Sequence, residues 1–306
     1  MKILLIGFGS IGQRHYENLR KLGYKDIAVY DPNNARFKEH QDFKRFEAVF
    51  VCNPTHMHAA TALKAARAGC NLFIEKPLSH SSSGLQEVLA EAKKRKLVTF
   101  VACNLRFHPA IKKVKSLLER KFLGKVYAIY LEYGRYLPYQ RPFVDYQKTY
   151  AARKSMGGGI LLDDVHDFDL LFWLNNFEGV RKSDILCAKA SNLDIDVEDI
   201  CNAHFLFRNN VVGNIRCDYL QQHKKRSLKI IGEKGNLEWN FRENIVWFEY
   251  ARNGQEKKRR LFTGSKEDEE IMYRYELKYF LSCARSKKQT FNTLETAYKT
   301  LLQMKR

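Results

Sequence analysis

The sequence lacks any long apolar run. Hydrophobic residues make up 45% of the 306 positions, but no segment reaches the roughly 20 consecutive apolar residues that cross a bilayer. The first ten residues, MKILLIGFGS, also lack the extended apolar stretch and the small-residue cleavage site of a secretory signal. We therefore expect a soluble, cytoplasmic protein with no membrane partner.

Paired cysteines are missing as well. The seven cysteines are odd in number, and none stands in a CxxC pair or at metal-finger spacing. This pattern excludes a disulfide framework and a zinc finger, and it is typical of reduced, mostly buried thiols in a cytoplasmic protein. No metal site is predicted.

Acidic residues are few compared with basic ones. The chain has 34 Asp and Glu against 53 Lys and Arg, which gives a formal net charge of +19. Such a charge attracts nucleic acid, anionic membranes or phosphorylated small molecules. The basic residues are scattered, for example at 93–96, 112–115 and 257–260, and no nucleic-acid motif accompanies them. We interpret them as solvated helix faces and loop tips, predict no nucleic-acid partner, and retain the weaker inference that a substrate carrying phosphate would be attracted.

The hydrophobic pattern changes near residue 120. Before it, short buried apolar runs alternate with segments predicted to be helical at 10–23, 56–68, 82–95 and 109–119, the pattern of an α/β, doubly wound parallel sheet. After it, alternating runs separated by turns predict an α+β domain with an open, mainly antiparallel sheet. Helices are predicted in this part at 157–175, 267–286 and 293–304. We predict two domains, 1–120 and 121–306, with a last helix that is able to pack back on the first domain.

A glycine-rich loop follows the first predicted strand and opens the first predicted helix. It consists of Gly7, Phe8, Gly9, Ser10, Ile11 and Gly12. Glycine permits the tight turn, the close approach of a pyrophosphate and tight helix packing, with the phosphates at the helix N-terminus. Asp31 ends the second predicted strand, where an acid binds a ribose 2′-hydroxyl. This favours NAD over NADP, although Arg36 nearby softens the preference, and S-adenosylmethionine is an alternative cofactor for such a loop.

Two later motifs separate these alternatives. CNPTHMH (52–58) and IEKPLS (74–79), together with GFGSIGQRH and GGGILLDDVHDFDLL, resemble the Gfo/Idh/MocA oxidoreductases. The resemblance implies a Rossmann domain that binds a nicotinamide cofactor and a second domain whose open sheet mediates oligomerisation, so we expect a homodimer or homotetramer. It implies that further cofactor contacts come from Cys52, Asn53, Pro54, Thr55, His58, Glu75, Lys76 and Asn104.

The resemblance also implies a catalytic set of Lys76, Asp163 and His166. Hydride transfer from a secondary alcohol needs a base for the hydroxyl proton, and a histidine suits that task near neutral pH. His166 is the predicted base, and Lys76 is predicted to stabilise the negative charge that develops on the reacting oxygen. Asp163 is predicted to orient the imidazole or to bind a neighbouring substrate hydroxyl.

Substrate contacts are predicted in two places. Arg106 follows the last predicted strand of the first domain, and the segment 136–159, rich in Tyr, Arg and Pro, is expected to cover the substrate cleft. Its candidates for gripping a hydroxylated or phosphorylated ligand are Arg141, Asp145, Tyr146, Tyr150 and Arg153.

The sequence departs from the family pattern at two intervals. The stretch 31–47 is short, which predicts that the third strand is shortened or absent. The three-residue spacing of Asp163 and His166 resembles a branch found among bacterial surface-sugar oxidoreductases. We predict an NAD(P)-dependent dehydrogenase or reductase of a sugar, sugar phosphate or nucleotide-sugar in surface glycan biosynthesis. The alternative is a non-catalytic sensor that binds cofactor or sugar. Apolar residues such as Ile215, Ile230 and Trp239 suggest that dimers form through sheet faces.

Overall fold

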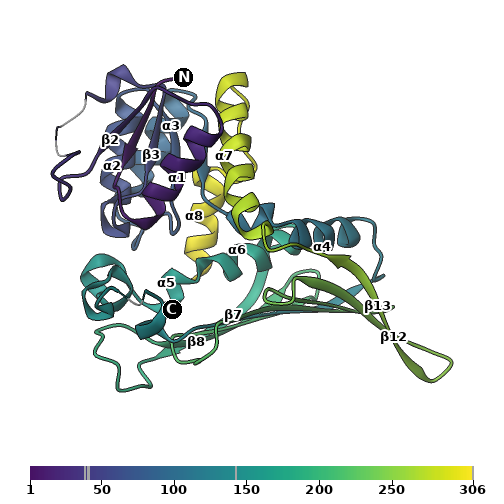
Figure 1. Ribbon diagram of the computed structural model, residues 1–306. Coiled ribbons are helices and arrows are strands. Elements are labelled where there is room, and N and C mark those ends of the chain that lie inside the picture. Colours follow the sequence, from purple (N-terminus) through teal and green to yellow (C-terminus); the bar gives the residue numbers. More distant parts are fainter. Residues whose placement is uncertain (38, 40–41, 142, 305–306) are drawn as a thin grey trace. The chain divides into compact units, whose positions relative to one another are not determined.

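The computed structural model describes residues 1–37, 39, 42–141 and 143–304, and the chain forms two compact units. The first unit contains residues 1–104, 155–157 and 270–303. The second contains residues 105–154, 158–269 and 304. Each unit has its own sheet, and Figure 1 labels several elements of each.

The first unit is built on a parallel sheet of five short strands in the order β2-β1-β3-β4-β5. The strands are β1 (Ile3–Ile6), β2 (Ile27–Tyr30), β3 (Ala48–Val51), β4 (Asn71–Ile74) and β5 (Thr99–Val101). β1 and β3 are buried along their whole length, as expected for strands that are covered on both faces. The predicted doubly wound sheet is confirmed. Among the described strands, β2 lies at one edge of this sheet. The stretch 31–47 was predicted to contain a shortened third strand or none, and its described residues form no strand.

Helices flank this sheet (Figure 1). They are α1 (Ser10–Lys21), α2 (His58–Arg67), α3 (Leu85–Lys94), most of α7 (Asp268–Ser286) and α8 (Leu294–Gln303). Phe280 of α7 packs on Phe50 of β3 and Phe73 of β4, with ring centroids 5.6 and 5.5 Å away. Aromatic packing of this kind excludes water from the centre of the unit. No helix within the described residues is both long and apolar enough to cross a membrane.

The second unit contains an eight-stranded sheet in the order β13-β12-β11-β10-β6-β9-β8-β7. The strands are β6 (Val126–Gly134), β7 (Val180–Ala188), β8 (Ile200–Phe207), β9 (Val212–Asp218), β10 (Lys225–Gly232), β11 (Gly235–Asn240), β12 (Ile245–Arg252) and β13 (Gln255–Thr263). β6 and β9 pair in parallel, and the other neighbours are antiparallel. The predicted open, mainly antiparallel sheet is confirmed.

The strand β13 was not predicted. The basic run 257–260 lies exposed on this edge strand, so its interpretation as a helix face or loop tip is wrong. Charged side chains on an edge strand discourage pairing with another chain.

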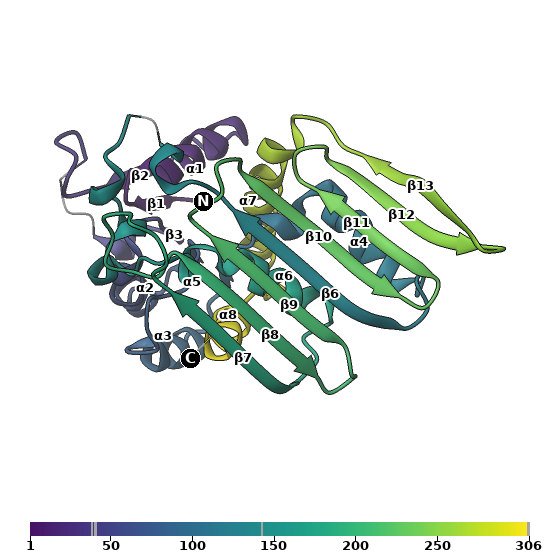
Figure 2. The same ribbon diagram turned by 90° about the horizontal axis from the view of Figure 1, so that it is seen from below.

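One face of the large sheet is covered and the other is open. α4 (Pro109–Glu119) packs on β12 and β13, and α6 (Val165–Leu174) packs on β6 and β9; Figure 2 views the sheet from its open face. Ile215, Ile230 and Trp239 are at most 2% exposed and alternate with the open-face residues. They belong to the covered face, so they lend no support to a dimer through the open face. That face carries polar pairs instead, such as Lys229 with Glu238 and His204 with Asn214.

Candidate active site

The glycine-rich loop has the geometry of a phosphate-binding turn. Gly7 has φ +92°, and a Cβ there would lie 2.5 Å from the Asn53 nitrogen. A Cβ on Gly12 would lie 2.0 Å from the Gly7 carbonyl oxygen, whereas one on Gly9 would meet nothing within 4 Å. The first turn of α1 has no acidic residue, and no side chain caps its N-terminus. An exposed loop therefore leads into a helix N-terminus whose amides can bind phosphate, so the residues fit a dinucleotide.

Asp31 lies beside this loop. Its Oδ2 accepts a hydrogen bond from the Phe8 amide at 2.7 Å, and its Oδ1 accepts one from the Asn33 amide at 2.9 Å. The exposed Arg36 guanidinium lies 5.2 Å from the centroid of the Phe37 ring. The carboxylate predicted to bind a ribose is thus held next to the loop predicted to bind the pyrophosphate.

The segment 52–58 follows β3, which is the neighbour of β1 in the sheet. In a doubly wound sheet, ligands bind where the strand order reverses, which here is between β1 and β3. Cys52 and Thr55 are buried, and burial raises the pKa of the Cys52 thiol. Asn53 and Pro54 are half-buried, and the Asn53 amide nitrogen donates to Thr61 at 2.9 Å. Of the predicted cofactor contacts in this segment, Asn53 and Pro54 are the two that are half-buried and not fully buried.

Backbone contacts hold both ring nitrogens of His58. The ring is 2% exposed, and its Nδ1 and Nε2 lie 2.9 and 2.8 Å from the carbonyl oxygens of Pro77 and Asn53. Burial lowers the pKa of this imidazole, although the two backbone contacts oppose the shift. His58 therefore connects the loop after β3 to the loop after β4, and its cofactor contact stays a prediction.

Lys76 is half-buried and follows β4 at the carboxyl edge of the sheet. The preceding Glu75 is only 7% exposed, and its carboxylate contacts His15 at 2.5 Å and the Lys76 amide at 3.1 Å. This carboxylate is engaged inside the unit, so Glu75 does not fit the predicted cofactor contact. Asn104 is 5% exposed, and its buried Oδ1 has no hydrogen-bond partner among the described residues. An unpaired buried oxygen of this kind is expected where a ligand binds.

In the second unit, the helix predicted over 157–175 is two helices, α5 (Ile160–Asp163) and α6. Gly159 caps α5 with φ +105°, and a Cβ there would lie 2.4 Å from Glu198 Oε1. The break falls at Asp164, which has φ −98° and ψ 31°. A continuous helix was the wrong prediction, because Asp163 and Asp164 are buried carboxylates that pair with cations from different strands.

Asp163 is surrounded by hydrogen-bond donors. It is 7% exposed and accepts from Arg135, from the Tyr150 hydroxyl at 2.7 Å and from the Tyr219 hydroxyl at 3.1 Å. Burial, and then the charge of Asp163, raise the pKa of both tyrosines well above the usual value. The arrangement makes Asp163 a fixed negative charge. His166 lies half-buried in the first turn of α6.

Sequence reasoning missed Arg135 and Tyr219. Arg135 is the first residue after β6, and Tyr219 is the first residue after β9. These two strands are parallel neighbours, with Gly134 opposite Asp218. The carboxyl ends of parallel strands meet at one edge, so both side chains reach Asp163. In the sequence, each of these alternating runs is followed by a polar residue. That pattern indicates a shared site only once the parallel pairing of β6 with β9 is known.

Arg226 forms a second buried charge cluster, which sequence reasoning also missed. Its guanidinium pairs with Asp164 and Asp167, both of which are 0% exposed. Burial raises the pKa of Asp167 well above its usual value, and the charge of Arg226 opposes that shift. This cluster holds the start of α6 against the sheet.

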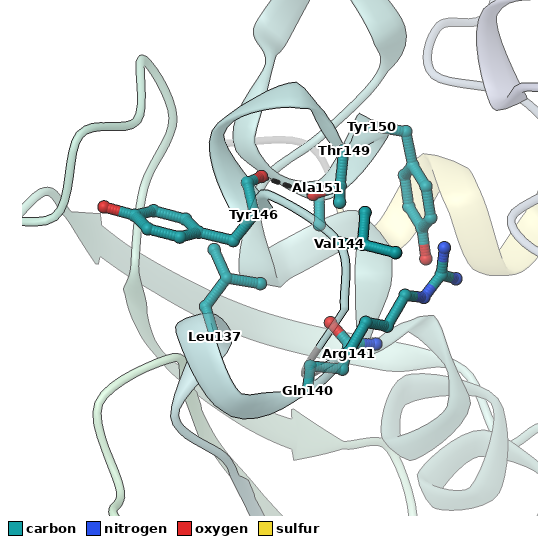
Figure 3. Close-up of a pocket in the computed structure, with 8 residues that line it drawn as sticks. All are labelled: Leu137, Gln140, Arg141, Val144, Tyr146, Thr149, Tyr150 and Ala151. Atoms are coloured by element: carbon teal, nitrogen blue, oxygen red, sulfur yellow. Dashed lines mark hydrogen bonds between the residues drawn. The ribbon is translucent and has the colours of Figure 1, made fainter.

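The predicted substrate residues fall into two groups. Arg141, Tyr146 and Tyr150 line a small pocket of the segment 137–151, and Figure 3 shows the Arg141 side chain extending toward the Tyr150 hydroxyl. Tyr146, however, accepts a hydrogen bond from the Asp194 amide at 3.2 Å through its hydroxyl. The Tyr150 hydroxyl is engaged as well, by Asp163, and the substrate contacts of Arg141, Tyr146 and Tyr150 stay predictions.

Three other candidates are occupied by structural contacts. Asp145 caps a short turn through the Gln147 amide at 3.1 Å, and Arg153 Nε donates to the Gln147 carbonyl at 2.7 Å. Arg106 is 2% exposed and forms a two-pronged ion pair with Asp169. These contacts stabilise the fold locally, and we no longer propose substrate binding for the three residues.

Comparison with known proteins defines the class. Residues 1–103 match the profile described as "Oxidoreductase family, NAD-binding Rossmann fold", and residues 111–238 match the "GFO/IDH/MocA C-terminal domain". The chain is therefore an oxidoreductase-type protein with an NAD-binding Rossmann domain. It belongs to the GFO/IDH/MocA family, as the sequence motifs predicted.

Its relatives include two curated proteins. Myo-inositol 2-dehydrogenase of Thermotoga maritima is 30% identical over 56% of this chain and 53% of its own length. UDP-N-acetylglucosamine 3-dehydrogenase of Acidithiobacillus ferrooxidans is 24% identical over 80% of this chain and 76% of its own length. The chain thus spans about half the length of the first of these relatives.

A solved structure shares the fold over the whole chain. Levoglucosan dehydrogenase in complex with NADH superposes with a TM-score of 0.84 at 19% identity, covering 99% of this chain and 95% of its own. At this identity the likeness establishes the fold.

Proposed function

We propose that the protein transfers a hydride between NAD and a ring hydroxyl or ketone of a sugar, sugar phosphate or nucleotide-sugar. The observation that carries this proposal is the Asp31 carboxylate, held against the exposed glycine-rich loop by the Phe8 amide. The relatives support a cyclic polyol or sugar substrate, because their names specify myo-inositol, UDP-N-acetylglucosamine and levoglucosan.

The bound nicotinamide supplies the hydride acceptor in the oxidative direction. Lys76, at the carboxyl edge of the first sheet, donates a hydrogen bond to the reacting oxygen and stabilises its negative charge. His166 removes the hydroxyl proton. Asp163, held by Arg135, Tyr150 and Tyr219, accepts a hydrogen bond from a neighbouring substrate hydroxyl or orients His166.

A role in surface glycan biosynthesis, a cytoplasmic location and a homodimer or homotetramer complete the proposal. The spacing of Asp163 and His166 supports the first, and the oligomer rests on the family resemblance. Light scattering at working concentration tests the oligomer, and a monomer would remove it.

Replacement of Asp31 by alanine tests the cofactor assignment. Wild-type protein is expected to bind NADH more tightly than NADPH, because the Asp31 carboxylate hydrogen-bonds a ribose hydroxyl and repels a 2′-phosphate. Loss of a charged hydrogen bond of about 1.5–3 kcal/mol should weaken NADH binding by about 10- to 100-fold in the variant. The measurement is titration of each protein with each dinucleotide.

Asp42→Ala is the matched control, since this exposed carboxylate in the same connection caps a short turn through the Lys44 amide. It should leave both affinities unchanged. Equal weakening of NADH binding by Asp31→Ala and Asp42→Ala would contradict the assignment. It would also be contradicted if the wild-type protein bound neither NADH nor NADPH.

A further inference from the structure

A buried polar cluster lies within the first unit, beneath the proposed cofactor edge. It consists of His15 on α1, Glu75 directly after β4 and Glu276 on α7, each at most 7% exposed. One side-chain atom from each lies within 4.8 Å of the others. The mechanism above uses none of the three, yet burying two carboxylates is costly unless they are paired or neutral.

Glu75 uses both of its oxygens. Oε1 lies 2.5 Å from His15 Nε2, and Oε2 accepts the amide hydrogen of Lys76 at 3.1 Å. On the other side of Lys76, the Pro77 carbonyl oxygen lies 2.9 Å from His58 Nδ1. The backbone that carries Lys76 is therefore held at two points by buried side chains.

Glu276 links the cluster to a second strand end. Its Oε2 accepts the Cys103 amide at 3.3 Å, and Cys103 directly precedes Asn104. Its Oε1 is buried and has no hydrogen-bond partner among the residues that the structure describes. Burial, and then the charge of Glu75, raise the pKa of Glu276 well above its usual value.

The surroundings of the cluster keep water out. The His15 ring lies 5.1 Å from the Phe73 ring and 6.4 Å from the Tyr273 ring, measured between centroids. The charged or titratable groups around it are Arg14, Cys52, His58, Lys76 and Tyr273. Burial raises the pKa of Glu75, but the hydrogen bond and charge of His15 outweigh this, and its net pKa lies below the usual value. Hydrogen bonds in such an apolar setting are strong and directional.

We propose that His15, Glu75 and Glu276 form a buried polar cluster that positions Lys76 for catalysis. Glu75 is the anionic positioning residue, His15 holds it in place, and Glu276 contributes a neutral carboxyl that anchors the segment before Asn104. The cluster connects the helix of the glycine-rich loop with the strand end that carries Lys76. This inference rests on the proposed function.

Kinetics of two variants test the positioning role. Glu75→Gln and His15→Gln are expected to lower kcat about 10- to 100-fold, the usual effect of removing a residue that orients a catalytic one. NADH affinity should stay at the wild-type value, and the pH profile of kcat should shift because the Lys76 ammonium is displaced. Glu276→Gln keeps a neutral side chain of the same shape and should retain kcat.

The control is Glu87→Gln on the exposed face of α3, which should change nothing. Circular dichroism identifies a variant that does not fold, in which case the other of the two variants decides. Wild-type kcat and pH profile in Glu75→Gln or His15→Gln would overturn the proposal. So would a loss of kcat in Glu276→Gln equal to that in Glu75→Gln, or a stoichiometric metal ion in purified protein that Glu276→Gln removes.

Thermal melting tests the same cluster without any substrate. Because the folded protein keeps a proton on Glu276 that the unfolded chain loses above the usual carboxyl pKa, wild-type stability falls as pH rises through this range. Glu276→Gln cannot ionise, so its Tm relative to wild type should increase from about pH 5 to about pH 8. A constant difference would overturn the proposal even if no sugar were turned over, whereas absence of turnover alone would contradict only the proposed function.

Discussion

Replacement of Lys76 by methionine is expected to abolish turnover while dinucleotide binding remains largely intact. The ammonium group is proposed to stabilise the charge on the reacting oxygen, and loss of one such donor lowers kcat by about 10²- to 10³-fold. His166→Ala should have an effect of similar or larger size, because a positioned base contributes about 10²- to 10⁴-fold. Initial rates with sugars, sugar phosphates and nucleotide-sugars, together with NADH titration, measure both effects.

Lys94→Met is the control, since this exposed lysine lies in the same unit but at the C-terminal end of α3, and not directly after a strand. Turnover that survives both Lys76→Met and His166→Ala would refute the mechanism. Wild-type protein that binds NADH but turns over none of these sugars would favour a sensor that binds cofactor without catalysis.

Replacement of Arg226 by methionine is expected to lower the free energy of unfolding strongly. Its guanidinium pairs with Asp164 and Asp167, and all three side chains are at most 7% exposed. Removing one partner from a buried charge cluster typically costs about 3–5 kcal/mol, because the remaining charge is left uncompensated. Urea unfolding measures the free energy of unfolding of wild type and variant. Asp164→Asn in the same chain should restore part of the loss by removing one of the stranded carboxylates.

Lys225→Met provides a matched control one residue away. Lys225 pairs with Glu132 at 2.6 Å, but it is 46% exposed, and exposed ion pairs contribute only about 0–1 kcal/mol. Equal losses in Lys225→Met and Arg226→Met would show that the buried cluster adds no special stability.

Local patterns determined the first unit and its proposed cofactor site. β1 and β3 are short apolar runs buried along their whole length, so composition alone marks them. The glycine-rich loop and Asp31 could be located because strand, turn and helix follow one another directly in the chain. The placement of Lys76 at the carboxyl edge follows from the same order.

Side-chain orientation at that edge could not be read from the chain. Glu75 and His58 belong to motifs that the resemblance connects with the cofactor. Both side chains are buried, because Glu75 contacts His15 and His58 contacts the Pro77 carbonyl oxygen. His15 and Glu276 were not singled out, since 261 positions separate them in sequence and only packing of α1 and α7 on one sheet brings them together.

In the second unit the sequence by itself determined that strands alternate and that a cluster of acids opens a helix. Tertiary structure decided what those acids do. The parallel pairing of β6 with β9 brings Arg135 and Tyr219 to Asp163, and β10 brings Arg226 to Asp164 and Asp167. Periodicity records which face of an element is buried, whereas the partner of a buried charge depends on which strands become neighbours.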